Sequence, residues 1–120
     1  MKACVAALIL LMAVPLFAHP PKNVELEYDS DAGILSAVIE HSVNNASKHY
    51  VNKVVVEVNG KKRIEQTFTR QIDGEQHEVM YKVKDVEEGD KVAVIAYCNI
   101  SGRKKSEVII SAEQPEEGTE

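Results

Sequence analysis

The chain has 120 residues, which is enough for one domain and too few for two of ordinary size. A total of 14 Lys and Arg against 19 Asp and Glu gives a formal net charge of -5, so the chain lacks the basic footprint of a nucleic-acid-binding domain. With only two cysteines, Cys4 and Cys98, it is neither a disulfide-dense scaffold nor a zinc protein with four thiolate ligands. Hydrophobic residues make up 44%, a value typical of a folded globular domain.

The first 18 residues have the pattern of a secretory signal peptide. An uncharged apolar run, residues 3–17, follows a lysine, and Ala18 places a small residue at the expected cleavage position. The run is shorter than the roughly 20 apolar residues of a transmembrane helix and contains Pro15, although a retained membrane anchor is the alternative. Cleavage after Ala18 predicts a secreted or periplasmic protein without a membrane segment, which begins at His19 and keeps Cys98 as its one cysteine.

From residue 24 onward, alternating apolar and polar residues predict short β-strands separated by turns. Asn59-Gly60 is a strong signal for a two-residue hairpin. No segment has the period of an amphipathic helix, so we expect an all-β fold, a seven-stranded immunoglobulin-like β-sandwich over residues 19–112. An acidic disordered tail with four Glu is expected over residues 113–120. The expected strands are residues 24–28, 34–39, 51–58, 61–72, 76–83, 91–100 and 105–111.

Candidate site residues lie where the expected strands end. His41 follows one strand, His49 precedes the next, and Cys98 lies near the end of another. Because strand ends meet on one rim of a sandwich, two imidazoles and a thiolate can converge there, and this donor set suits iron, copper or zinc and not calcium or magnesium. The residues alone leave other interpretations open: exposed histidines with an inert buried thiol, a cysteine–histidine nucleophile pair, or an intermolecular disulfide.

Three segments carry a resemblance to a known family. Residues 96–102 are Ala-Tyr-Cys-Asn-Ile-Ser-Gly, His41 is followed by Lys-His-Tyr-Val at residues 48–51, and residues 19–25 are His-Pro-Pro-Lys-Asn-Val-Glu. In order and approximate spacing these segments resemble the superoxide reductases and the iron-centre domain of desulfoferrodoxins. That family has a Tyr-Cys-Asn-Ile/Leu-His-Gly signature, a His-Tyr-Ile stretch and a His-Val-Pro-x-Ile-Glu start. The resemblance covers most of the chain after residue 18 and implies a seven-stranded immunoglobulin-like fold.

The resemblance implies a mononuclear iron that reduces superoxide to hydrogen peroxide. In the family, four equatorial histidines and one axial cysteine thiolate hold the iron, and the sixth position stays open for superoxide. Carried over residue by residue, His19, His41 and His49 are the equatorial ligands and Cys98 is the axial ligand. An external electron donor, such as a rubredoxin-like protein, would re-reduce the iron, and association into a homo-oligomer is left open.

The chain departs from the family at several positions of the site. The fourth histidine of the signature falls on Ser101, so His77 or a water molecule would have to complete the ligand set. The family's lysine that attracts superoxide falls on Ala18, and Lys48 is the nearest basic alternative by sequence. The interval between His41 and the next histidine is also two residues longer than in the family.

Two further functions are compatible with the sequence. If cleavage leaves His19 at the amino terminus, its α-amine and imidazole can chelate copper together, with another histidine completing the site. Alternatively, the chain is a non-catalytic immunoglobulin-like binding module that keeps the reductase fold and not its activity.

Overall fold

The computed structural model describes residues 19–111 of the chain. The signal-peptide prediction for residues 1–18 and the acidic-tail prediction for residues 113–120 lie outside the described residues. Within the described part, no helix is long and apolar enough to cross a membrane.

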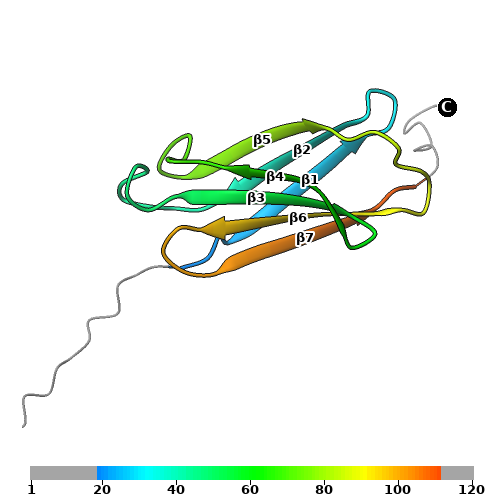
Figure 1. Ribbon diagram of the computed structural model, residues 1–120. Helices are drawn as coiled ribbons and strands as arrows, with labels where there is room; N and C mark the ends of the chain where they lie inside the picture. The colour runs from blue at the N-terminus through cyan, green and yellow to red at the C-terminus, as the bar shows by residue number, and fades with distance from the viewer. Residues whose placement is uncertain (1–18, 112–120) are drawn as a thin grey trace, which may run out of the picture.

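Residues 19–111 form seven antiparallel β-strands in two sheets (Figure 1). The three-stranded sheet has the order β1-β2-β5, and the four-stranded sheet has the order β4-β3-β6-β7. This arrangement confirms the all-β class and the predicted seven strands. The strands are β1 (Asn23–Asp29), β2 (Ile34–Glu40), β3 (Val51–Val58), β4 (Lys61–Thr67), β5 (Gln76–Lys82), β6 (Lys91–Cys98) and β7 (Arg103–Ile109).

The two sheets share one aliphatic core. Alternate residues of β2 are buried, because successive side chains of a strand point to opposite faces of the sheet. Leu35 and Ile39 of β2 are fully buried and belong to the same cluster as Val54 of β3 and Val94 of β6. Burial of each such side chain stabilises the fold by about 1.5–3 kcal/mol.

The predicted hairpin between β3 and β4 is confirmed. Asn59 and Gly60 have φ angles of 52° and 81°, the left-handed values that a two-residue turn of this kind requires at both positions. This tight turn keeps β4 beside β3 in the four-stranded sheet. In constant-type immunoglobulin domains the fourth strand joins the other sheet instead.

The predicted fourth strand, residues 61–72, is too long. β4 ends at Thr67, and residues 68–75 leave the sheet as a loop. The physical reason is Gln71, whose side chain is fully buried and donates hydrogen bonds to the carbonyl oxygens of His41 and Asp73. The neighbouring turn, residues 99–102, also lies outside the strands, so β6 is shorter than predicted and β7 begins earlier.

The antiparallel strands bring four separate segments to one end of the sandwich (Figure 1). We call this the histidine end: it comprises residues 19–22, the 41–50 loop, the 68–75 loop and the 99–102 turn, together with the strand residues that adjoin them, such as His77 and Cys98. The opposite end, the turn end, comprises residues 30–33, 59–60 and 83–90. Every candidate ligand from the sequence lies at the histidine end.

Candidate metal centre

An irregularity at the start of β3 sets His49 beside Cys98. Val51 pairs with Cys98 across β3 and β6, but the register shifts between Val51 and Lys53. A bulge of this kind re-aims the chain next to it. His49 stands two residues before Val51, and its Nε2 lies 3.1 Å from the Cys98 sulfur.

Asn99 fixes the main chain on both sides of His49. Its Oδ1 accepts a hydrogen bond from the Tyr50 N–H at 2.8 Å, and its Nδ2 donates to the Lys48 carbonyl oxygen at 2.9 Å. The Asn99 N–H also donates to the Tyr50 carbonyl oxygen at 3.0 Å. Because Asn99 directly follows Cys98, the same residue ties the thiol and the imidazole into one local structure.

Cys98 is a free cysteine with only 8% of its surface exposed. The Ile100 N–H donates toward its sulfur at 3.4 Å, and the Cys98 N–H donates to the Gly102 carbonyl oxygen at 3.0 Å. The turn after β6 therefore holds this sulfur with one main-chain N–H aimed at it.

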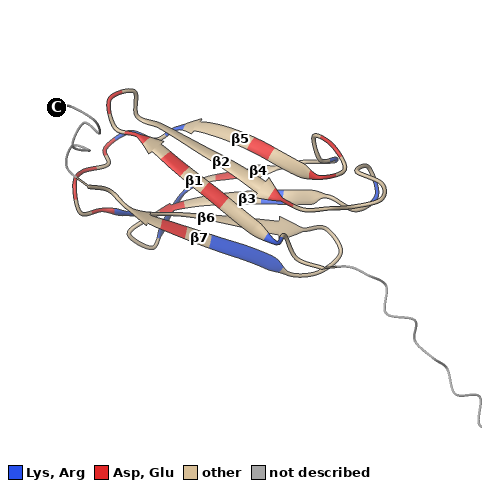
Figure 2. Ribbon diagram, turned by 180° about the vertical axis from the view of Figure 1, so that it is seen from behind, with Lys and Arg blue, Asp and Glu red and all other residues tan. Residues whose placement is uncertain are grey.

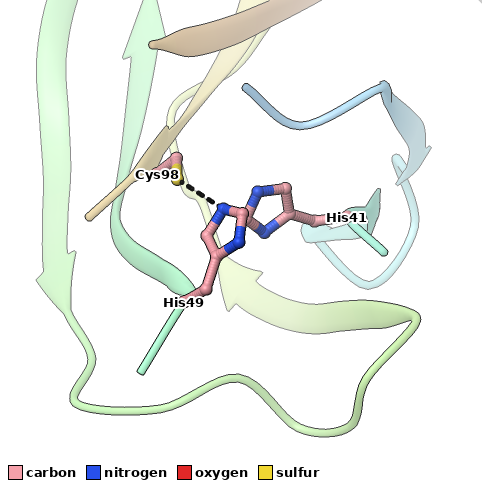
Figure 3. Close-up of side chains that lie close together, drawn as sticks. All are labelled: His41, His49 and Cys98. Carbon is pink, nitrogen blue, oxygen red and sulfur yellow. Dashed lines mark hydrogen bonds between the residues drawn. The ribbon is translucent and has the colours of Figure 1, made fainter. Parts of the chain in front are cut away.

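His41 enters the centre from the end of β2 and is fully buried. The imidazoles of His41 and His49 and the thiol of Cys98 point toward one another (Figure 3). One ligand atom of each residue lies within 4.8 Å of the other two. Among residues 19–111, these three side chains form the group that could hold a metal ion.

His19 lies next to this group. Its ring centroid is 5.2 Å from that of His41 and 5.4 Å from that of His49. Gly102 lets the segment approach, since a Cβ there would come within 2.8 Å of the Pro20 Cβ. The structure thus brings the third predicted histidine beside the centre, although its ring nitrogens are not among the atoms within 4.8 Å of one another.

The other residues named from the sequence are not among the three ligand side chains. Lys48 is exposed in the loop directly before His49, and Ser101 is exposed in the turn after Cys98. His77 lies on β5 against Phe68, with ring centroids 4.4 Å apart, and its Nδ1 accepts a hydrogen bond from the Ile72 N–H at 3.0 Å. His77 therefore supports the 68–75 loop and is not in the group that could hold a metal.

The surroundings of His49 favour its neutral imidazole. Burial lowers the pKa of His49, and the neighbouring His41 and His19 lower it further, against a smaller opposing effect of the His19 backbone. Burial also lowers the pKa of His77, although Asp73 and Glu78 oppose it. Since a metal ion binds the neutral imidazole, the lowered pKa of His49 keeps it ready as a ligand at neutral pH.

An open groove of about 940 Å³ adjoins the centre at His19. Its basic side chains are Lys22, Arg103 and Lys104, and its acidic ones are Glu40 and Glu75. Figure 2 shows the basic run at the start of β7 as one continuous stretch. Arg103 and Lys104, at the start of β7, are called the basic edge of this groove.

The donor set fits a transition metal. Two imidazole nitrogens and a thiolate sulfur suit iron, copper or zinc, whereas calcium and magnesium take oxygen ligands. Compared with known proteins, the chain matches no family model and no curated protein.

Sequence reasoning missed two residues that organise this centre. Asn99 was visible in the Cys-Asn pair of residues 98–99, but nothing in the sequence gave its side chain a role. Gln71 had no local signal, because it stands within a stretch that alternates like a strand.

Proposed function

We propose that this protein is a mononuclear iron protein that reduces superoxide to hydrogen peroxide. The single observation that carries the proposal is the convergence of His41, His49 and Cys98, whose ligand atoms lie within 4.8 Å of one another. His19, whose ring adjoins both histidines, is the additional ligand in this proposal. The resemblance of the three sequence segments to superoxide reductases selects iron from the metals that suit this donor set.

The proposed reaction is a one-electron reduction. Iron, when bound, would supply one electron, which superoxide would take up with two protons to give hydrogen peroxide, and an external donor protein would return the electron to the iron. The chain's own residues hold the metal and set its environment. The Cys98 thiolate, with the Ile100 N–H aimed at its sulfur, tunes the potential of the metal. Lys48 and the basic edge of the groove attract the anionic substrate.

The test begins with anaerobic reconstitution of the chain with Fe(II), followed by oxidation. We expect one iron per chain and a thiolate-to-iron charge-transfer band that disappears in Cys98→Ser. His77→Gln is the matched control, because His77 lies outside the ligand group, and it should keep both the iron and the band. Absence of the band in the unmodified protein would contradict the proposal.

The stoichiometry of the reaction is a second measurement. Reduction yields one hydrogen peroxide per superoxide and no oxygen, whereas dismutation yields one hydrogen peroxide and one oxygen from two superoxides. With a chemical reductant present, we expect the first ratio. A non-catalytic metal carrier would give the iron signal without faster loss of superoxide, and a binding module without metal would give neither.

Copper is the second candidate, and the position of His19 favours it. The His19 imidazole lies beside His41 and His49, and in a chain that begins at His19 the same residue also offers its α-amine. This proposal predicts a tight Cu(II) complex that is abolished by one extra residue ahead of His19. The iron proposal predicts that the same extension leaves the charge-transfer band in place.

The proposed location is the periplasm or the exterior of the cell, after cleavage behind Ala18. Mass spectrometry of the protein recovered from its natural source gives its first residue. A protein that starts at His19 supports export, and one that starts at Met1 contradicts it.

A further inference from the structure

Gln71 is fully buried at the histidine end, and its amide makes four hydrogen bonds. Nε2 donates to the His41 carbonyl oxygen at 2.7 Å and to the Asp73 carbonyl oxygen at 2.9 Å. Oε1 accepts from the Val51 N–H at 3.1 Å and faces His41 Nδ1 at 2.8 Å. These contacts use both hydrogens of the amide and both lone pairs of its oxygen.

The orientation of this amide follows from the main chain alone. Two carbonyl oxygens face Nε2 and one N–H faces Oε1, so exchanging oxygen and nitrogen would oppose like groups at all three contacts. Gln71 therefore presents an acceptor to His41, whatever the state of the imidazole.

The two ring nitrogens of His41 face different partners. Nδ1 faces the fixed Oε1 of Gln71, and Nε2 faces the His19 carbonyl oxygen at 3.0 Å. If Nδ1 carried no hydrogen, its lone pair would face the lone pair of Gln71 Oε1 at 2.8 Å. This contact is repulsive, and the amide cannot turn to relieve it because its main-chain partners fix its orientation. His19 is exposed, so its carbonyl can move away from Nε2.

From this geometry we infer that Gln71 is a positioning residue, which keeps the His41 hydrogen on Nδ1 and so presents the Nε2 lone pair to the metal. The inference rests on the proposed metal centre. Metal-bound histidines commonly donate their other N–H to an acceptor in this way, and loss of that acceptor costs about 10–100-fold in metal affinity. Metal binding at Nε2 then requires the His19 carbonyl oxygen to give up its place.

The decisive measurement uses the metal-free full chain labelled with ¹⁵N-histidine at pH 8. Long-range ¹H–¹⁵N correlation shows which ring nitrogen of His41 carries the hydrogen. In the unmodified chain we expect it on Nδ1. In Gln71→Met no acceptor faces Nδ1, so the hydrogen should move to Nε2, where the His19 carbonyl oxygen accepts it. Gln71→Glu keeps an acceptor for Nδ1 and should keep the hydrogen there, while its second oxygen faces the carbonyl oxygens of His41 and Asp73 and lowers the stability of the fold.

Affinity for Fe(II) alone is measured by competition with a chelator under anaerobic conditions. We expect Gln71→Met to bind iron about 10–100-fold more weakly than the unmodified chain, with Gln71→Glu between the two. Gln66→Met is the matched control, because Gln66 is exposed on β4 and its side chain accepts from the Tyr81 hydroxyl and not from a ligand residue. It should change neither the tautomer nor the affinity.

Several outcomes would overturn the inference. They are a hydrogen on Nε2 in the unmodified chain, a hydrogen that stays on Nδ1 in Gln71→Met, or equal iron affinity in that variant. A purely structural role for Gln71 predicts lower stability in both variants with no change of tautomer. If Gln71→Met does not fold, the unmodified chain and Gln71→Glu still decide the tautomer. Failure of the unmodified chain to bind iron contradicts the proposed function. The tautomer measurement in the metal-free chain still decides whether Gln71 keeps the hydrogen on Nδ1.

Discussion

The two ends of the sandwich share the same strands but treat polar groups differently. Among residues 19–111, the buried polar side chains are His41, Gln71 and His77, and all three lie at the histidine end. At the turn end, side chains hydrogen-bond to main-chain groups nearby in the sequence. Asp29, which is exposed, accepts hydrogen bonds from the N–H groups of Asp31 and Ala32. Asp90 likewise accepts from the Glu87 N–H at 2.8 Å. The difference separates an end that only connects strands from the end that holds the candidate metal centre.

The polar interior of the histidine end has an energetic cost. A buried polar group without a partner costs about 1–3 kcal/mol, and most buried groups are therefore hydrogen-bonded. The buried side-chain atoms without a partner in the described chain are Asn52 Oδ1 and His77 Nε2. Asn52 sits at the bulge that aims His49, and His77 supports the loop of Gln71. Both unpaired polar atoms thus lie beside the candidate centre, and departures of this kind are expected at functional sites.

The largest effect that would separate the two ends is loss of a ligand. His49→Ala should weaken metal binding by at least about 100-fold, or about 2.7 kcal/mol, because a direct ligand matters more than the outer partners that cost 10–100-fold. Asn59→Ala at the turn end should leave the affinity unchanged and lower only the stability, since Asn59 has a φ of 52°. Metal titration gives the affinities of both variants, and urea unfolding gives their stabilities. An equal fall in affinity in the two variants would contradict the difference between the two ends.

Two glycines with the same backbone angle provide a smaller and closely matched comparison. Gly60 at the turn end and Gly102 at the histidine end both have a φ of 81°, but only Gly102 meets a neighbour where a Cβ would stand. Gly60→Ala should cost about 1 kcal/mol of unfolding free energy from backbone strain, and Gly102→Ala about 1–2 kcal/mol.

The second readout for the glycine pair is the position of His19. The new methyl of Gly102→Ala pushes the Pro20 ring away, so proton contacts between the His19 ring and the rings of His41 and His49 should weaken in NMR spectra. Gly60→Ala should keep them. Unchanged contacts in both variants would show that Gly102 does not hold the terminal segment in place.

Much of the fold follows from local sequence patterns. The alternation in residues 34–39 and the pair Asn59-Gly60 each determine structure over a few residues, and both predictions are confirmed. The same reasoning placed His41, His49 and Cys98 at one rim, because antiparallel strand ends must meet there. Predicting that these three residues lie close together requires only the positions of the strands, which the alternating pattern indicates.

The support of the centre could not be predicted in this way. Gln71 hydrogen-bonds His41 across 30 residues of sequence, and nothing near it shows that a polar side chain turns inward. The bulge at Asn52 is likewise set by pairing with β6. Membership of the superoxide reductase family stays a prediction, and so does the iron. The convergence of strand ends explains why the donor atoms lie together, but it does not determine which metal they bind.

The smallest expected effect is a difference in how the two ends respond to acid. Burial lowers the pKa of His49, so the unfolded chain binds more protons than the folded one as pH falls below about 6.5, and stability is lost there. At the turn end, hydrogen bonds from the Glu87 N–H and the Asn59 side chain lower the pKa of Asp90, so its contribution is present above about pH 3.9 and lost below it. Unfolding free energies of the metal-free chain from pH 8 to pH 3 should therefore fall in two separate windows. His49→Gln should make the loss in the upper window smaller, and the lowered pKa of His77 leaves the rest of that loss in place. Asp90→Asn should make the loss in the lower window smaller, and the lowered pKa values of Asp73 and Glu65 leave the rest. An acid transition that neither variant changes would contradict this expectation.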